Sequence, residues 1–453
     1  MRDRRSPARK PLATLLADYG PFRIAHSGSG VLHIGRPVRC SFRLAQAENG
    51  SCFLACRLGE LEQFITGRPA EVMLSLSGKS AGLDIDVPRD KAMAVSEHHI
   101  YAGERDSMTE VVFRIRQFST SRRVDGVSCQ QRFLLTNLEL DGSDSCTLCV
   151  EWRGRSERVT LAPIEDYRAV VRRVELARST AVTAHMTFAS EVEDAVGLAD
   201  ALCRVLSLGE GRKVQWIAVQ VLDEDEAVLD EDAFSQATRH WGPWPPIQTE
   251  RDALTSYVES VFDTYVERRE CWGLDRLIDA YCDAKGNLAY LESSAIQLVV
   301  VLEMLKAQYL QVHGPKDGRI LSKAQFRRLT KALKDAVGAV GLDYELSDED
   351  RCSMTEKVQE FNRYSFRSIL RRMCLELDVG LSEPEQTQLT KLTKLRNGLV
   401  HSGRFPSEAG DNQPTHVESF MFLHSAIDRL FLSVLKYKGY YWDWGNRSKQ
   451  LLD

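Results

Sequence analysis

The sequence predicts an α+β protein with three successive parts. Residues 1–163 contain short apolar or alternating runs separated by turn residues, which predicts a β-rich N-terminal domain, either a sandwich or barrel-like. Residues 164–246 change to a strand–helix–strand pattern that ends in a Pro- and Trp-rich linker. Residues 247–453 carry apolar residues at helical spacing almost throughout, which predicts an all-α bundle.

The bulk composition is that of an ordinary globular chain. It has 453 residues, of which 43% are hydrophobic and 27% charged, and a formal net charge of -5. A chain of this charge does not attract nucleic acid as a whole, so any RNA site must be a local basic patch.

Several features indicate a cytoplasmic protein. The most apolar stretch, "AIQLVVVLEML", is too short for a membrane span and predicts a buried helix. The basic start "MRDRRSPARK" has no apolar core behind it, so it is not a secretory signal. The eleven cysteines are scattered, and the one CxxC pair, Cys146 and Cys149, has no second ligand pair at zinc-site spacing. We expect no membrane partner, no metal and no cofactor.

Three predictions concern local structure in the first two parts. The runs "RFLLTNLEL" and "SCTLCVEW" flank Asp141-Gly142, which favours a hairpin. The helix "EVEDAVGLADALCRVLSLGEG" should end at Gly209 or Gly211, between two strands. Trp241 and Trp244 in the linker are expected to dock it on a neighbouring element.

The third part contains a series of helices with recognisable ends. One helix is expected to start at Ser347 and run to Gly380. The next is expected from Ser382 to near Gly403 and contains "LTKLTKLRNGLVHSGRF". A last helix, "THVESFMFLHSAIDRLFLSVLKYKG", should complete the bundle.

The helix 382–403 combines a packing stripe with polar residues that packing does not require. Its leucines at 389, 392, 395 and 399 predict the face toward the bundle. Beside them stand Arg396, Asn397 and His401. Histidine exchanges protons near pH 7, and arginine offers a fixed fork of donors to phosphate oxygens. These residue types suit phosphodiester chemistry, because the RNA 2′-hydroxyl supplies a nucleophile without a metal.

The Arg-Asn-x-x-x-His spacing near the end of a helical bundle resembles the signature of the HEPN superfamily. The order of a β-rich region before a helical domain is similar to that of ApeA-like abortive-infection proteins. The resemblance implies a metal-independent ribonuclease in which Arg396 and His401 act in RNA cleavage and Asn397 supports them. It also implies a homodimer with the two motifs face to face. The tyrosine that some HEPN toxins carry two residues after the histidine is replaced here by Gly403.

A second basic feature lies nearby. Arg363, Arg367 and Arg371 recur every four residues, and Lys394 and Arg404 extend positive charge around the motif. These five residues are the candidate RNA contacts, against the alternative of a solvated helix face.

The sequence therefore predicts an endoribonuclease of anti-phage defence or growth arrest. Its substrate would be RNA, with tRNA among the candidates, and the N-terminal region would sense an unknown trigger or restrain the nuclease. Two alternatives stay open: a non-catalytic HEPN protein that dimerises or binds a protein partner, and a nucleotide-binding sensor. The histidine at a helix C-terminus is also favourable without any catalytic role.

Overall fold

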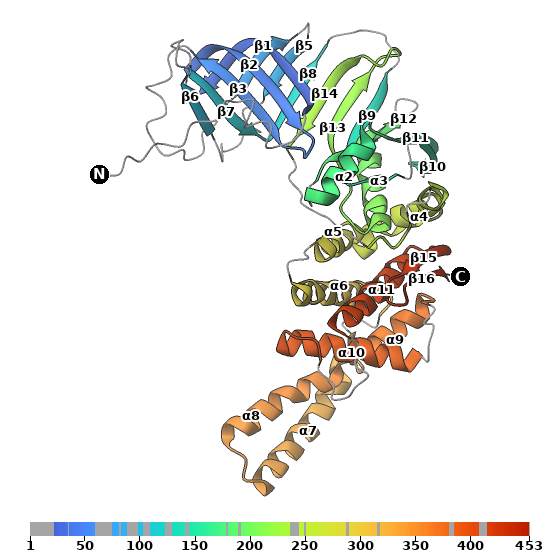
Figure 1. The fold of residues 1–453 in the computed structure, drawn as a ribbon. Coiled ribbons are helices and arrows are strands. Elements are labelled where there is room, and N and C mark those ends of the chain that lie inside the picture. The colour runs from blue at the N-terminus through green and yellow to red at the C-terminus, as the bar shows by residue number, and fades with distance from the viewer. Residues whose placement is uncertain are drawn as a thin grey trace. The chain divides into compact units, whose positions relative to one another are not determined.

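The computed structural model describes residues 22–34, 36–58, 75–80, 83–87, 98–102, 109–122, 129–140, 145–177, 180–188, 192–235, 244–248, 251–286, 290–314, 318–379, 385–406 and 415–452. The chain divides into two units, Met1–Asp263 and Thr264–Asp453. The first unit is rich in strands and the second in helices (Figure 1). The predicted α+β class, with a β-rich N-terminal region before a helical region, is confirmed.

The described strands of the first unit form one antiparallel sheet. They are β1 Phe22–Ile34, β2 Arg36–Ala47, β3 Cys52–Leu58, β4 Ser75–Ser80, β5 Leu83–Val87, β6 His98–Ala102, β7 Thr109–Ile115, β8 Gln117–Ser121, β9 Gln130–Thr136, β10 Cys146–Trp152, β11 Arg155–Pro163, β12 Val182–Phe188, β13 Gln215–Leu222 and β14 Val228–Phe234. Their order is β10-β11-β12-β9-β13-β14-β8-β5-β4-β1-β2-β3-β7-β6. Consecutive strands of the chain are therefore not always neighbours.

The sheet curves so that strands distant in its order share one core. Phe42 of β2 packs in one buried cluster with Val182 of β12 and Ile217 of β13. The side-chain amide of Gln46, at the end of β2, donates to the carbonyl oxygens of Ile217 (2.9 Å) and Phe234 (3.1 Å). Because a buried amide needs hydrogen-bond partners, these bonds hold β2 against β13 and β14. The sandwich or barrel-like curvature follows from this shared core.

The predicted strand–helix–strand segment is present and completes the same sheet. It consists of β12, the helix α3 (Ala195–Glu210) and β13, and both strands pair with β9. The helix ends as predicted, because Gly211 adopts a left-handed conformation (φ 64°) that favours glycine. A further helix, α2 (Tyr167–Ala177), contacts β12. In the linker, Trp241 lies outside the described residues, whereas Ile247 is buried and its N–H bonds to the Gly209 carbonyl (3.1 Å).

The predicted hairpin between β9 and β10 is wrong. Both strands exist, but β9 pairs with β12 and β13, and among the described strands β10 pairs only with β11. The turn residues Asp141 and Gly142 lie outside the described residues. The burial of the two strands explains the difference: Phe133 and Leu135 of β9 are both fully buried, as a central strand requires, whereas β10 alternates between exposed and buried positions and suits a sheet edge.

The second unit contains a series of helices, four of which contact α6. Their bounds are α4 Arg251–Trp272, which crosses the division between units, α5 Leu274–Gly286, α6 Leu291–Val312, α7 Lys323–Asp343, α8 Asp348–Lys357, the 3₁₀ helix η2 Val358–Asn362, α9 Phe366–Glu376, α10 Glu385–Ser402 and α11 His416–Val434. α6 contacts α5, α9, α10 and α11. Among the described helices it alone is long and apolar enough to cross a membrane, which is weak evidence because a core helix passes the same test. Its central position agrees with the predicted buried helix.

The single helix predicted from Ser347 to Gly380 is instead three elements. α8 and η2 are followed by Arg363 in an extended bridge to Arg319, and Ser365 then caps the N-terminus of α9. The Asn362 side chain bonds to the backbone of Leu321 through both its amide oxygen (2.7 Å) and its amide nitrogen (3.0 Å). These tertiary bonds replace the helical hydrogen bonds that would have continued η2 into α9.

The helical region ends in a small hairpin that the sequence pattern did not predict. It consists of β15 (Gly439–Asp443) and β16 (Ser448–Leu452). The buried guanidinium of Arg429 on α11 donates to the Tyr441 hydroxyl and the Asp443 carboxylate of this hairpin. The aromatic C-terminal tail is thus anchored on α11 by a charged pair.

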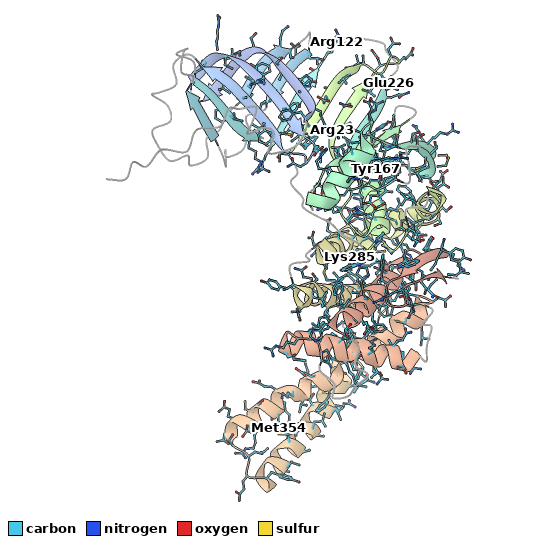
Figure 2. The ribbon with its side chains drawn as sticks, in the orientation of Figure 1. Arg23, Arg122, Tyr167, Glu226, Lys285 and Met354 are labelled. Atoms are coloured by element: carbon cyan, nitrogen blue, oxygen red, sulfur yellow. The ribbon has the colours of Figure 1, made fainter. Side chains whose placement is uncertain are left out.

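A group of buried polar side chains lies inside the second unit. Lys285 of α5, which is labelled in Figure 2, and Asp428 of α11 are both fully buried. The Lys285 Nζ lies 3.7 Å from an Asp428 carboxylate oxygen. Tyr281 donates to Asp428 and accepts from Lys285 at 2.6 Å. His424 Nδ1 lies 3.1 Å from the same carboxylate. Burial holds the pKa of His424 below its ordinary value. Burial alone would raise the pKa of Asp428, but its neighbours His424, Lys285 and Tyr281 hold it below the usual value.

We predict that Asp428→Ala destabilises the protein strongly. It removes the carboxylate but leaves the Lys285 ammonium in the interior, and breaking a buried pair in this way costs about 3–5 kcal/mol. The measurement is the free energy of unfolding in urea. The control is Asp348→Ala, which breaks an exposed ion pair with Arg351 and should leave the unfolding midpoint unchanged. An equal effect of the two changes would contradict the buried network.

His424 gives a second prediction, on pH dependence. Its pKa is lowered in the folded state, so below about pH 6.5 the unfolded chain binds a proton that the folded chain excludes. Stability should therefore fall as pH falls from 7.5 to 5.5, and His424→Gln should reduce this fall. The free energy of unfolding at both pH values is the measurement. His416→Gln, at an exposed position of the same helix, should retain the wild-type pH dependence.

Candidate functional site

Helix α10 presents the predicted leucine stripe to the rest of the bundle. Leu389, Leu392, Leu395 and Leu399 are all buried. The helix contacts α6, α9 and α11. The stripe therefore fixes the rotation of α10 about its own axis, and this rotation decides which residues face outward.

The three motif residues lie on the flank and the outer side of α10. At about 100° per residue, Asn397 lies about 100° and His401 about 140° around the axis from Arg396. Asn397 and His401 are exposed, whereas Arg396 is partly buried at the border of the leucine stripe. The motif thus forms one surface of the helix, with Asn397 between the other two residues around the axis.

Arg396 is held from two other helices. Its Nε donates to the Glu303 carboxylate of α6 at 2.8 Å, and its Nη1 donates to the Asn397 side-chain oxygen at 3.1 Å. Its guanidinium lies over the Phe366 ring at the start of α9, 5.4 Å from the ring centre. A charged bond and a ring face together orient the planar guanidinium.

A second cation shares the same carboxylate and the same ring. Lys306, one turn after Glu303 on α6, pairs with Glu303, and its ammonium lies 5.2 Å from the centre of the Phe366 ring. Burial alone would raise the pKa of Glu303, but hydrogen bonds from Lys306 and Arg396 hold it below its ordinary value. We name Glu303, Lys306, Phe366 and Arg396 the Arg396 cluster. With one anion and two cations, it keeps an excess positive charge at the border of the motif.

Two glycines shape the end of the motif helix. A side chain at Gly398 would lie 3.0 Å from the Pro406 ring and 3.1 Å from the Arg404 carbonyl oxygen, so the following chain folds back against this glycine. Gly403 ends the helix in a left-handed conformation (φ 66°), and its N–H bonds to the Leu399 carbonyl (3.1 Å). The close approach that the missing side chain of Gly398 allows is therefore used by the chain itself.

The five candidate RNA contacts are not on one helix face. Arg367 and Arg371 lie on α9, whereas Arg363 lies before it, in the bridge with Arg319. The arginine stripe at four-residue spacing is therefore wrong as a continuous helical stripe. Arg371, Lys394 and Arg404 are exposed and Arg367 is partly buried. Lys394 is on α10, and Arg404 follows its end.

The sequence reasoning missed the partners of Arg396. Glu303 lies in the apolar stretch that predicts only a buried helix, Lys306 follows this stretch directly, and no sequence pattern singles out Phe366. The available signal was a charged pair three residues apart inside an otherwise apolar run. Such a pair in a central helix needs partners from neighbouring elements.

Comparisons of the chain with protein-family models, with curated proteins and with solved structures found no match. The likeness to the HEPN superfamily therefore depends on the motif and on its position in a helical bundle.

The Arg396 cluster gives a prediction that is independent of activity. Glu303→Gln removes the charge that holds the guanidinium, so the Arg396 Nε–H should exchange faster with water. The measurement is the ¹⁵N-resolved NMR signal of that Nε–H, assigned by its loss in Arg396→Lys. Glu376→Gln, which breaks the exposed pair with Arg372 on α9, is the matched control and should leave the signal in place. Retention of the signal in Glu303→Gln would show that the contact does not hold Arg396.

Proposed function

We propose that this protein is a metal-independent endoribonuclease of the HEPN type. One observation carries the proposal: Arg396 is oriented by Glu303 and Phe366 beside Asn397, and His401 is exposed on the same helix. This combination supplies an oriented phosphate-binding cation and an accessible proton-transfer group.

The reaction needs only groups that the motif and RNA provide. His401 would take the proton of a ribose 2′-hydroxyl, whose oxygen then forms a bond to the adjacent phosphorus. The bond between phosphorus and the 5′-oxygen breaks, and the leaving oxygen is protonated. Arg396 would stabilise the negative charge that develops on the phosphate oxygens. The products are a 2′,3′-cyclic phosphate and a 5′-hydroxyl.

The exposed motif also supports a homodimer. A reaction of this kind benefits from exclusion of water, but His401 and Asn397 of one chain are open on their outer side. A second copy placed with its motif opposite the first would cover this side. It would also supply a second histidine, which could protonate the leaving 5′-oxygen.

The biological role is part of the same proposal. A cytoplasmic nuclease with a separate β-rich unit suits anti-phage defence or growth arrest, in which the sheet unit responds to a trigger. Degradation of RNA, tRNA among the candidates, would then stop growth of the infected cell.

One contact favours a second candidate function. Glu303 occupies one edge of the Arg396 guanidinium, which leaves fewer donors for a substrate phosphate. A bundle that binds a nucleotide or a protein partner without cleaving RNA is compatible with this arrangement. RNA cleavage itself distinguishes the two functions.

The test is incubation of the purified protein with total RNA and with tRNA in EDTA. The double variant Arg396→Ala, His401→Ala should lose at least about 100-fold in cleavage rate, because it lacks both the proton-transfer group and the charge-stabilising group. The products of the wild type should carry cyclic-phosphate ends.

The matched control changes the same residue types elsewhere. Arg155 and His33 are exposed residues of the sheet unit, and Arg155→Ala, His33→Ala should cleave as the wild type does. If the double variant at the motif cleaves as fast as this control, the nuclease site is not at Arg396 and His401.

A further inference from the structure

A basic groove lies in the helical hairpin formed by α7 and α8, outside the motif helix. The two helices lie side by side, and η2 contacts both (Figure 1). The groove has a volume of 830 Å³. We name it the hairpin groove; its lining residues are Arg319, Lys323, Phe326, Arg327, Thr330, Lys331, Lys334, Asp335, Glu356, Glu360, Asn362 and Arg363.

The base of the hairpin is closed by specific bonds. Ile320 N–H bonds to the Asn362 carbonyl (2.9 Å), and Tyr364 N–H bonds to the Gly318 carbonyl (3.2 Å). The side chain of Asn362, itself buried, adds its two bonds to Leu321. The chain therefore enters and leaves the hairpin at one fixed point. This arrangement sets Arg319 and Arg363 opposite each other in the groove wall.

The groove concentrates positive charge in a chain whose net charge is -5. Six of its lining residues are basic and three are acidic. Lys323, Arg327, Lys331 and Lys334 follow one another at spacings of four, four and three residues, which places them on one face of α7. At 1.5 Å per residue this row is about 16 Å long, whereas a stacked strand advances only about 3.4 Å along its axis for each phosphate. A row of this length matches a chain of phosphates better than a single nucleotide.

Two exposed aromatic residues flank lining residues of the groove in the sequence, although they do not line it themselves. Phe361 is 65% exposed and Tyr364 is 36% exposed, on either side of Asn362 and Arg363. Exposed aromatic rings beside a positively charged groove are the combination with which proteins bind single-stranded nucleic acid, because bases stack on the rings and phosphates pair with the cations. An acidic peptide would use the cations but would not need the rings.

The groove also adjoins the motif along the chain. Arg363 lies three residues before Phe366, the ring over which Arg396 is held. Three residues span at most about 10 Å, so the end of the groove lies close to the Arg396 cluster.

We propose that the hairpin groove is a binding site for single-stranded RNA. The cations of α7, with Arg319 and Arg363, contact successive phosphates, and Phe361 and Tyr364 stack with bases. The site is separate from the motif, and its binding of RNA does not depend on whether the motif cleaves RNA.

The test measures binding of a fluorescently labelled single-stranded RNA of twenty uridines to the full-length protein. The protein carries His401→Ala, so that RNA cleavage does not affect the measured dissociation constant. The test therefore gives a result whether or not the nuclease proposal is correct. The groove variant adds Lys323→Gln, Arg327→Gln and Lys331→Gln. We expect its dissociation constant to rise at least tenfold, and the slope of log K against log salt to fall by about 2, because each lost phosphate contact removes about 0.7.

The matched control removes three positive charges outside the groove. Arg276, Arg328 and Lys357 are exposed residues of α5, α7 and α8 that do not line it, and their replacement by Gln should change the dissociation constant less than twofold. An equal loss of RNA affinity in both triple variants would show that the loss depends on net charge and not on the groove, and this result would overturn the proposal. Absence of RNA binding by the His401→Ala protein at 50 mM salt would overturn it as well.

A third variant tests the rings separately from the charges. Phe361→Ala removes an exposed side chain, so we expect the fold to be retained, the affinity for RNA to fall and the salt slope to stay constant. If Phe361→Ala binds RNA as the parent does while poly-glutamate displaces RNA at matched charge concentration, the groove takes acidic polypeptide instead, and the proposal is wrong.

Discussion

The burial of the leucine stripe of α10 is the constraint on which the candidate site depends. Four leucines must leave water, and the surfaces that receive them belong to α6, α9 and α11. Once they are buried, α10 cannot rotate. Arg396 then has to lie where α6 and α9 meet, and Asn397 and His401 have to face outward. The polar chemistry of the motif is thus positioned by apolar packing.

The degree of burial separates two charged groups that otherwise look alike. The group around Lys285 and Asp428 is closed to water, so its charges satisfy one another and it serves the fold. The group around Glu303 and Arg396 lies at the border of the core and contains two cations for one carboxylate. Its excess charge is not cancelled internally. That difference is why we propose the second group, and not the more deeply buried one, as the site of a phosphate ligand.

Local patterns were predictable from the sequence, and contacts between distant segments were not. The leucine stripe and the end of α3 at Gly211 depend on residues within a few turns of one another. The break after η2 depends on a bond from Asn362 to Leu321, 41 residues earlier, and no helical periodicity reports such a bond. In the sheet, the turn signal between β9 and β10 was outweighed by the need of the buried strand β9 for neighbours on both sides. Glu303 was missed for the same reason, since its partner Arg396 is 93 residues away.

The same long-range contacts place the two proposed sites next to each other, so that one RNA strand could bind to both. An acidic chain repels RNA on average, so a cluster of only two cations at Arg396 would capture an RNA strand poorly. The hairpin groove offers a longer row of cations, and the Asn362 bonds fix its base directly before α9. Asn362, which closes the base of the groove, lies only four residues before Phe366, the ring over which Arg396 is held. One short segment therefore contributes to both sites. A strand held in the groove would therefore have its next phosphates close to the motif, which raises their local concentration without any additional contact.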